Sequence, residues 1–167
     1  KAINVRGAVY WPLFGALALS AIESQGLPAD DEAVKPRTIG YMARLANEKG
    51  LHHLVEAFIN IKQRPGFEDV RLQIAGWLGP PNEEYAKSLW DRLDNAGLQY
   101  AYEYLGAIDR VEKIEFLSQL DVLSVPTEFR EPKGLYALEA LAAGIPIVKP
   151  RHGAFPELIE QISRFLG

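Results

Sequence analysis

Two glutamates in one short segment are the first candidates for chemistry in this sequence. Glu131 stands shortly before Gly134, and Glu139 follows eight positions after Glu131, inside an apolar stretch. An ionised carboxylate is unfavourable in apolar surroundings unless a polar group meets it there. We therefore treat Glu139 as the strongest lead to function, with Glu131 beside it.

The stretch 134–143 predicts a short helix that ends at Gly144. Glu139 follows Leu135 by four positions, so the two share a face, and an apolar stripe is expected on Leu135, Leu138 and Ala142. Glu139 would then lie at the border of the buried face, where its carboxylate could accept hydrogen bonds from ligand hydroxyls such as a ribose diol. The alternative is a glutamate that pairs with a basic residue at a surface edge.

Two further features point to an anionic ligand. Gly134 is expected to open the helix, where free N–H groups and the helix dipole favour an anion. Arg44 and Lys49 stand in a loop after the first clear strand and before a helix, a placement that suits a diphosphate. The alternative for this loop is an ordinary solvated charged segment.

The elements that must position these residues alternate regularly. We expect strands at 38–42, 70–75, 100–105, 122–125 and 145–148, and helices at 51–63, 82–96, 109–120, 134–143 and 155–165. This pattern predicts an α/β fold with a Rossmann-like, doubly wound parallel sheet over residues 37–167. Ligands bind such sheets outside the C-terminal ends of the strands, which are followed here by the loops 43–50, 76–82, 106–109, 126–134 and 149–154.

Residues 1–36 are interpreted as an N-terminal arm and linker. Residues 7–22 carry no charge but are fewer than the roughly 20 that a membrane-spanning helix needs. The lysine and arginine before them faintly resemble a signal peptide, and the alternative is an apolar arm packed on this domain or on another. Because the chain begins with Lys1 and stops just after a helical stretch, we expect it to be part of a larger protein.

Composition narrows the function classes. The 167 residues carry a net charge of −4, which argues against a general nucleic-acid binder. No cysteine is present, which excludes disulfides, thiolate catalysis and cysteine zinc sites and fits a cytoplasmic location. The sequence contains no Walker A motif and no glycine-rich dinucleotide fingerprint after the first strand.

In combination, these segments resemble the donor-binding C-terminal half of retaining GT-B glycosyltransferases of group 1, also called family 4. The resemblance spans about residues 38–160 and rests on the order of its motifs. These are Arg44-Leu45 with Lys49-Gly50, Ala75-Gly76, Leu105-Gly106, Asp121 to Thr127, Glu131 to Leu135, Glu139-Ala140, Ala143 to Ile147, and Gly153 to Glu157. Departures from the family pattern are Thr127 for the usual serine, His152 for a common glycine, and Trp77 for a small polar residue.

The resemblance implies roles for the candidate residues. Arg44 and Lys49 would hold the donor diphosphate, Glu139 the ribose hydroxyls, and Glu131 would lie beside the transferred sugar in the catalytic centre. Backbone N–H groups around Lys133, Gly134 and Leu135 would meet the phosphate and sugar, and the turn Gly106-Ala107-Ile108 would flank the base. His52 and His53 carry no such role and are interpreted as solvated residues at a helix start.

The resemblance also implies partners and cofactors. The substrate would be a nucleotide-diphosphate sugar, with no cofactor and no metal, because the Asp-x-Asp motif of metal-dependent glycosyltransferases is absent from the sequence. The acceptor site would belong to a preceding N-terminal GT-B domain, and the full enzyme could associate peripherally with a membrane. The alternatives are a non-catalytic nucleotide-binding module and a GT-B nucleotide-sugar epimerase.

Overall fold

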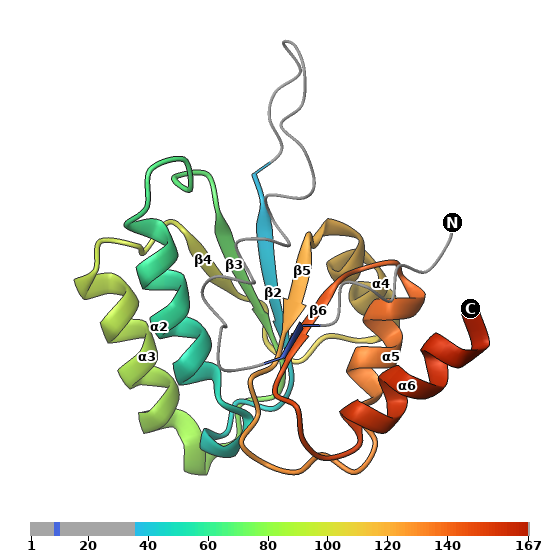
Figure 1. The fold of residues 1–167 in the computed structure, drawn as a ribbon. Helices are drawn as coiled ribbons and strands as arrows, with labels where there is room; N and C mark the ends of the chain where they lie inside the picture. The colour runs from blue at the N-terminus through green and yellow to red at the C-terminus, as the bar shows by residue number, and fades with distance from the viewer. Residues whose placement is uncertain (1–8, 11–35, 167) are drawn as a thin grey trace.

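A parallel six-stranded sheet forms the centre of the computed structural model, which describes residues 9–10 and 36–166 (Figure 1). The strand order is β1-β6-β5-β2-β3-β4, and every pair of neighbours is parallel. The strands are β1 (Val9–Tyr10), β2 (Thr38–Met42), β3 (Arg71–Ala75), β4 (Tyr102–Tyr104), β5 (Val122–Ser124) and β6 (Ile147–Lys149). The predicted doubly wound sheet is confirmed.

Helices cover both faces of this sheet (Figure 1). One face carries α2 (Leu51–Lys62) and α3 (Glu83–Asn95), and the other carries α4 (Arg110–Gln119), α5 (Leu135–Ala142) and α6 (Phe155–Leu166). Two short 3-10 turns, η2 (Asn47–Lys49) and η3 (Pro80–Asn82), precede α2 and α3. Every helix predicted from the sequence is present. Asp109 is the N-cap of α4 and accepts hydrogen bonds from the N–H groups of Val111 and Glu112.

The edge strand β1 was not predicted. Val9 pairs with Val148 and Tyr10 with Lys149, so two residues of the N-terminal arm extend the sheet beyond β6. Residues 1–8 and 11–35 of the arm, on which the signal-peptide and linker interpretations fall, lie outside the described residues.

Strand β2 is the centre of the core. All five of its residues are buried, as expected for an inner parallel strand covered on both faces. Ile39 and Tyr41 face the α2–α3 layer, and Met42 faces the layer of α4, α5 and α6. At Gly40 a Cβ atom would overlap the side chain of Leu120, so the glycine lets the end of α4 pack directly on the sheet.

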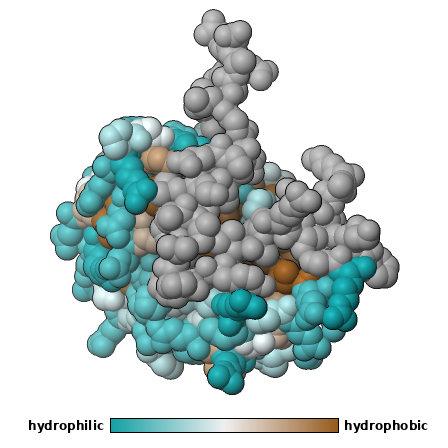
Figure 2. Space-filling model, in the orientation of Figure 1, coloured by the Kyte–Doolittle hydropathy of each residue, from teal (hydrophilic) through white to brown (hydrophobic). Residues whose placement is uncertain are grey.

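The outer surface over α2 and α3 is mostly hydrophilic in the view of Figure 2, consistent with the amphipathic pattern of both helices. Among the described residues, no helix is both long and apolar enough to cross a membrane.

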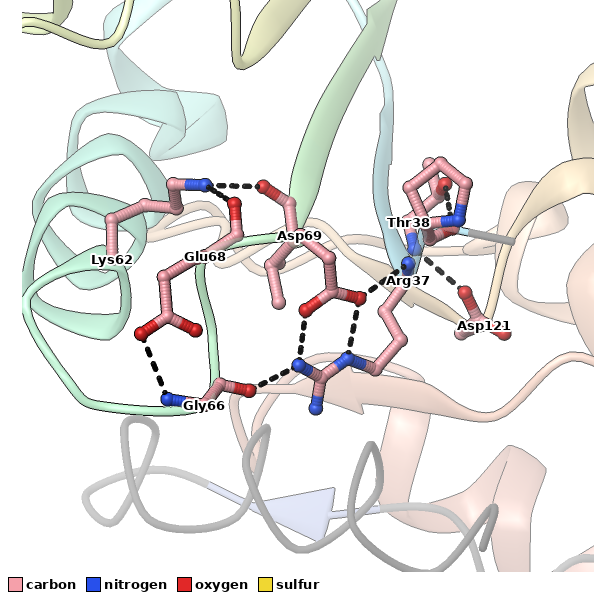
Figure 3. A network of polar contacts seen from close by, with 9 residues as sticks. Arg37, Thr38, Lys62, Gly66, Glu68, Asp69 and Asp121 are labelled. Atoms are coloured by element: carbon pink, nitrogen blue, oxygen red, sulfur yellow. Dashed lines mark hydrogen bonds and ion pairs between the residues drawn. The ribbon is translucent and has the colours of Figure 1, made fainter. Parts of the chain in front are cut away.

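A polar network fixes the N-terminal edge of the sheet, opposite the expected ligand edge (Figure 3). The guanidinium of Arg37 pairs with the carboxylate of Asp69, with a distance of 2.9 Å from Nε to Oδ2, and also reaches the carbonyl of Gly66. Asp121 accepts from the backbone N–H of Thr38 at 2.6 Å, which ties the start of β5 to the start of β2. Lys62 donates to the carbonyl oxygens of Glu68 and Val70, which holds the α2–β3 connection.

This network predicts a pH-dependent contribution to stability. The hydrogen bond from Arg37 lowers the pKa of Asp69 to about 2, below its ordinary value of 3.8. The stabilisation is therefore complete above about pH 4 and is lost as the pH falls toward 2. Asp69→Asn should lower the free energy of unfolding at pH 7 by about 1 kcal/mol, a small value because the pair is about a third exposed.

Urea unfolding between pH 2 and 7 measures this effect, with exposed Asp91→Asn as the matched control. The difference between wild type and Asp69→Asn should shrink at the acid end. A difference that stays constant with pH would contradict the assignment.

Candidate functional site

The order of the strands reverses between β2 and β5. The chain runs from β2 outward through β3 to β4 and then returns to place β5 and β6 on the other side of β2. The loops that follow β2, β5 and β6 gather at the lower edge of the sheet in Figure 1. In open parallel sheets this switch point, at the C-terminal ends of the strands, is where ligands bind.

Direct contacts lock the loops after β2 and β5 together. The carbonyl of Glu48 accepts hydrogen bonds from the Thr127 hydroxyl at 2.9 Å and from the Glu128 N–H at 3.0 Å. Gly50 has a φ of 73°, and a Cβ there would overlap the carbonyl of Pro126. Thr127, which replaces the family's usual serine, thus uses its hydroxyl to join the two loops.

This junction brings two predicted site residues into contact. The ammonium of Lys49 pairs with Oε1 of Glu131, and the two side chains are only 13% and 11% exposed. The Lys49 ammonium also lies 5.4 Å from the centre of the Phe129 ring. If one partner of such a buried ion pair is removed, the charge of the other is left buried without compensation, which is strongly destabilising.

Arg44 is on the same loop but is not part of the buried pair. Its guanidinium contacts the carboxylate of Glu48 at 3.1 Å, and both side chains are well exposed. The structure therefore places Arg44 at the exposed rim of the candidate site, where its side chain can change rotamer at little cost in free energy.

Gly134 opens α5 as predicted. It is the N-cap residue, with a φ of 59°, and a Cβ there would overlap the ring of Phe155 at the start of α6. Its neighbours Lys133 and Leu135 are exposed. The glycine therefore allows the first turn of α5 to lie against α6 and fixes where the free N–H groups of the helix point.

The prediction of which face of α5 is buried was wrong. Leu135 is 60% exposed, and Leu138 and Ala142 are exposed as well. The face that packs on the core is instead formed by Ala137, Ala140 and Leu141. In an eight-residue helix that is apolar nearly all round, periodicity does not identify the buried side.

Glu139 is half-buried and has a partner that the sequence did not identify. Its Oε1 accepts from the ammonium of Lys113 in α4 at 2.8 Å. This is the surface-edge pairing that the sequence analysis left open as the alternative. The two residues come from successive helices, and no local spacing in the sequence links them.

The turn Gly106-Ala107-Ile108 lies on the other side of β2, after β4. Gly106 has a φ of 75°, and its carbonyl accepts from the N–H of Gly76 at 2.7 Å. Tyr104 donates to the carbonyl of Gly76 at 2.9 Å, and Ile108 packs on the core while Ala107 is exposed. The turn is thus joined to the loop after β3, where Trp77 is about half exposed and covers Gly79.

His52 and His53 are not simply solvated. Their side chains are 23% and 31% exposed, and both contact the carboxylate of Glu128. Burial is the main cause that lowers the pKa of His52, while the hydrogen bond with His53 lowers the pKa of Glu128.

Lys149, at the end of β6, is the functional candidate that the sequence analysis missed. It is buried, donates to the hydroxyl of Tyr136, and has the ring centres of Tyr136 and Phe155 at 4.2 and 4.0 Å from its ammonium. Burial, with a smaller contribution from the charge of Lys49, lowers the pKa of Lys149 to about 6. A lysine that ends an apolar strand gives no motif by which it could be found.

Comparison with known proteins decides the family. The family described as glycosyl transferases group 1 matches residues 28–164. The chain belongs to the group 1 glycosyl transferases.

Curated relatives in this family include an uncharacterized glycosyltransferase of Methanocaldococcus jannaschii, 30% identical over 78% of this chain and 30% of that protein. A glycogen synthase of Mycobacterium tuberculosis is 32% identical over 76% of this chain and 30% of its own length. The chain thus spans about a third of the length of the curated relatives it matches.

Solved structures share the fold. Anabaena HepE, in complex with UDP and glucose, superposes with a TM-score of 0.67 at 21% identity over 95% of this chain and 38% of its own. The C-terminal domain of a group 1 family protein from Francisella tularensis gives 0.64 at 23% identity, over 88% of this chain and 78% of that domain. The predicted family resemblance and its Rossmann-like fold are confirmed.

The buried pair of this glycosyl transferase domain should behave as a unit. Glu131→Gln leaves the Lys49 ammonium buried without its counter-charge and should lower the free energy of unfolding by about 3 kcal/mol. Adding Lys49→Met should recover most of that loss, because the double variant buries no charge. Urea unfolding of the two single variants and the double variant gives the coupling energy. Additive losses would show that the pair does not form.

Lys149 should reduce stability at neutral pH. Its folded-state pKa of about 6 lies below its ordinary value of 10.5, so the folded chain binds fewer protons and stability rises with pH between these values. Lys149→Met, similar in size, should raise the free energy of unfolding at pH 7 by about 2 kcal/mol. The gain should fade toward pH 10.

Denaturant unfolding from pH 6 to 10 tests this expectation, with exposed Lys87→Met as the matched control. A loss of stability in Lys149→Met at pH 7 would mean that the two rings hold a charged ammonium instead.

Proposed function

We propose that this chain is the donor-binding C-terminal domain of a retaining glycosyltransferase that transfers a sugar from a nucleotide-diphosphate sugar to an acceptor. The observation that carries the proposal is the contact between Lys49 and Glu131 at the switch point, in a chain that belongs to this family. A cation and a carboxylate from two different loops are held there, at the edge where ligands bind.

In this proposal the donor diphosphate takes the place of the Glu131 carboxylate beside Lys49. The N–H groups at Gly134 and Leu135, at the start of α5, would meet the same phosphates or the sugar, since helix N-termini favour anions. Arg44 at the rim would turn inward from Glu48. Glu131, released from Lys49, would then face the transferred sugar.

The nucleoside would extend toward the other loops. Lys113 contacts Oε1 of Glu139, and a ribose diol would be met by the second oxygen, Oε2. The base would lie near Gly106, Ala107 and Ile108. HepE, whose structure was solved with UDP and glucose and with UDP-glucose, supports a nucleotide sugar as the ligand class.

The chemistry that this site would contribute is electrostatic. Negative charge develops on the departing diphosphate, and Lys49, Arg44 and the α5 N-terminus would balance it without a metal or a cofactor. The acceptor would be held by a preceding N-terminal GT-B domain. We therefore expect transfer only when both domains are joined, because catalysis requires the reactants to be positioned together.

A non-catalytic nucleotide-binding module is the second candidate, favoured by one observation. Each charged residue assigned to the donor already has a protein partner: Arg44 has Glu48, Lys49 has Glu131, and Glu139 has Lys113. Such ion pairs would also be expected in a domain that no longer binds a nucleotide sugar.

Calorimetric titration with UDP, GDP, ADP and their sugars separates these readings. We expect one nucleotide to bind, and Glu139→Ala to weaken it at least tenfold, because hydrogen bonds to a carboxylate are worth about 1.5–3 kcal/mol. Lys113→Met removes the ion pair but keeps the carboxylate, so it should bind within about threefold of wild type; exposed Glu115→Ala on the same helix as Lys113 is the control.

Equal losses in Glu139→Ala and Lys113→Met would make the glutamate structural and refute the ribose assignment. If none of the nucleotides binds even when the N-terminal domain is joined, the donor-binding proposal is wrong.

A further inference from the structure

Two imidazoles and one carboxylate converge beside the site, outside the proposed donor contacts. His52 and His53 are in the first turn of α2, and Glu128 is in the loop after β5. Oε1 of Glu128 lies 2.7 Å from Nε2 of His53 and 3.4 Å from Nε2 of His52. One ligand atom from each residue fits within 4.8 Å of the others, among the residues that the structure describes.

The donor set and its spacing match a borderline-soft divalent cation. Zn²⁺ binds imidazole nitrogen and carboxylate oxygen at about 2.0–2.2 Å, so tetrahedral ligand atoms are about 3.4 Å apart. The His52 distance already has this value, and the His53 distance needs to open by less than 1 Å. Mg²⁺ and Ca²⁺ prefer oxygen ligands and suit this set poorly.

A second residue orients one of the rings. The hydroxyl of Tyr85 in α3 lies 3.0 Å from Nδ1 of His52 and 3.1 Å from its backbone nitrogen. This contact leaves Nε2 as the nitrogen directed at Glu128. Histidine ligands in metal sites are commonly held in this way through their other ring nitrogen.

The third ligand is also held in place. The backbone N–H of Glu128 donates to the carbonyl of Glu48, and the Thr127 hydroxyl donates to the same oxygen. The carboxylate therefore comes from a loop that is joined to the start of α2, and the three side chains keep their positions without a long flexible connection.

We propose that His52, His53 and Glu128 bind a divalent transition-metal ion, with Zn²⁺ as the best fit and water in the remaining position. The ion would join the start of α2 to the loop after β5, three residues from Lys49. The ion would stabilise the junction between the loops after β2 and β5. It would lie outside the proposed donor contacts and take no part in sugar transfer. The proposal does not depend on the proposed function.

Titration of the untagged protein with ZnCl₂ tests the site, because a polyhistidine tag would bind the ion itself. We expect one ion per chain and a rise in melting temperature. His53→Gln, which keeps a hydrogen-bonding group, and Glu128→Gln should each weaken binding at least tenfold, and Tyr85→Phe should weaken it less than the loss of a ligand. Two controls are used: Glu84→Gln at an exposed position, and His152→Gln at the third histidine, which is partly buried.

Cobalt(II) provides a spectroscopic test of direct coordination, because its visible spectrum changes only when a side chain binds the ion. Four-coordinate binding gives strong visible absorption, which should be present in wild type and absent in His53→Gln. Variants are compared only after their metal-free melting temperatures show that they fold. The proposal is overturned if wild type binds no Zn²⁺ at about 1 mM, or if His53→Gln and Glu128→Gln bind as tightly as wild type.

Discussion

The junction between the loops after β2 and β5 is the constraint on which the candidate site depends. One carbonyl, that of Glu48, accepts from both the side chain of Thr127 and the backbone of Glu128, and Gly50 allows Pro126 to approach. These contacts decide where Lys49 meets Glu131, and they also set the position of Glu128 relative to the two histidines. The parallel sheet brings the two loops to the same edge, and the contacts of the junction fix how the residues of one loop are aligned with those of the other.

Much of the fold follows from local pattern. The regular alternation of short strand-like and helical segments predicted β2 to β6, and Gly134 was correctly placed at the start of α5. The two residues of β1 could not be found in the same way, because an edge strand of that length is defined by its partner β6 and not by its own sequence.

The site was harder to predict because its interactions join distant elements. Lys49 and Glu131 were both selected from the sequence, yet nothing local indicated that they contact each other. Lys113 and Lys149 were missed for the same reason: one is an ordinary residue on α4, and the other ends a buried strand. The face of α5 was misassigned because tertiary packing chose among apolar residues that the sequence does not distinguish.

The charge states of Lys49, Glu131 and Lys149 explain how Lys149 can be buried at the end of β6, near this junction. Lys49 and Glu131 neutralise each other, and burial keeps Lys149 largely uncharged at neutral pH, so the unliganded site carries little net charge. Desolvation is the main cause, since a buried amine is favoured in its neutral form. The cost of burying Lys149 therefore remains as stability lost at neutral pH, and not as an unpaired charge beside the Lys49–Glu131 pair.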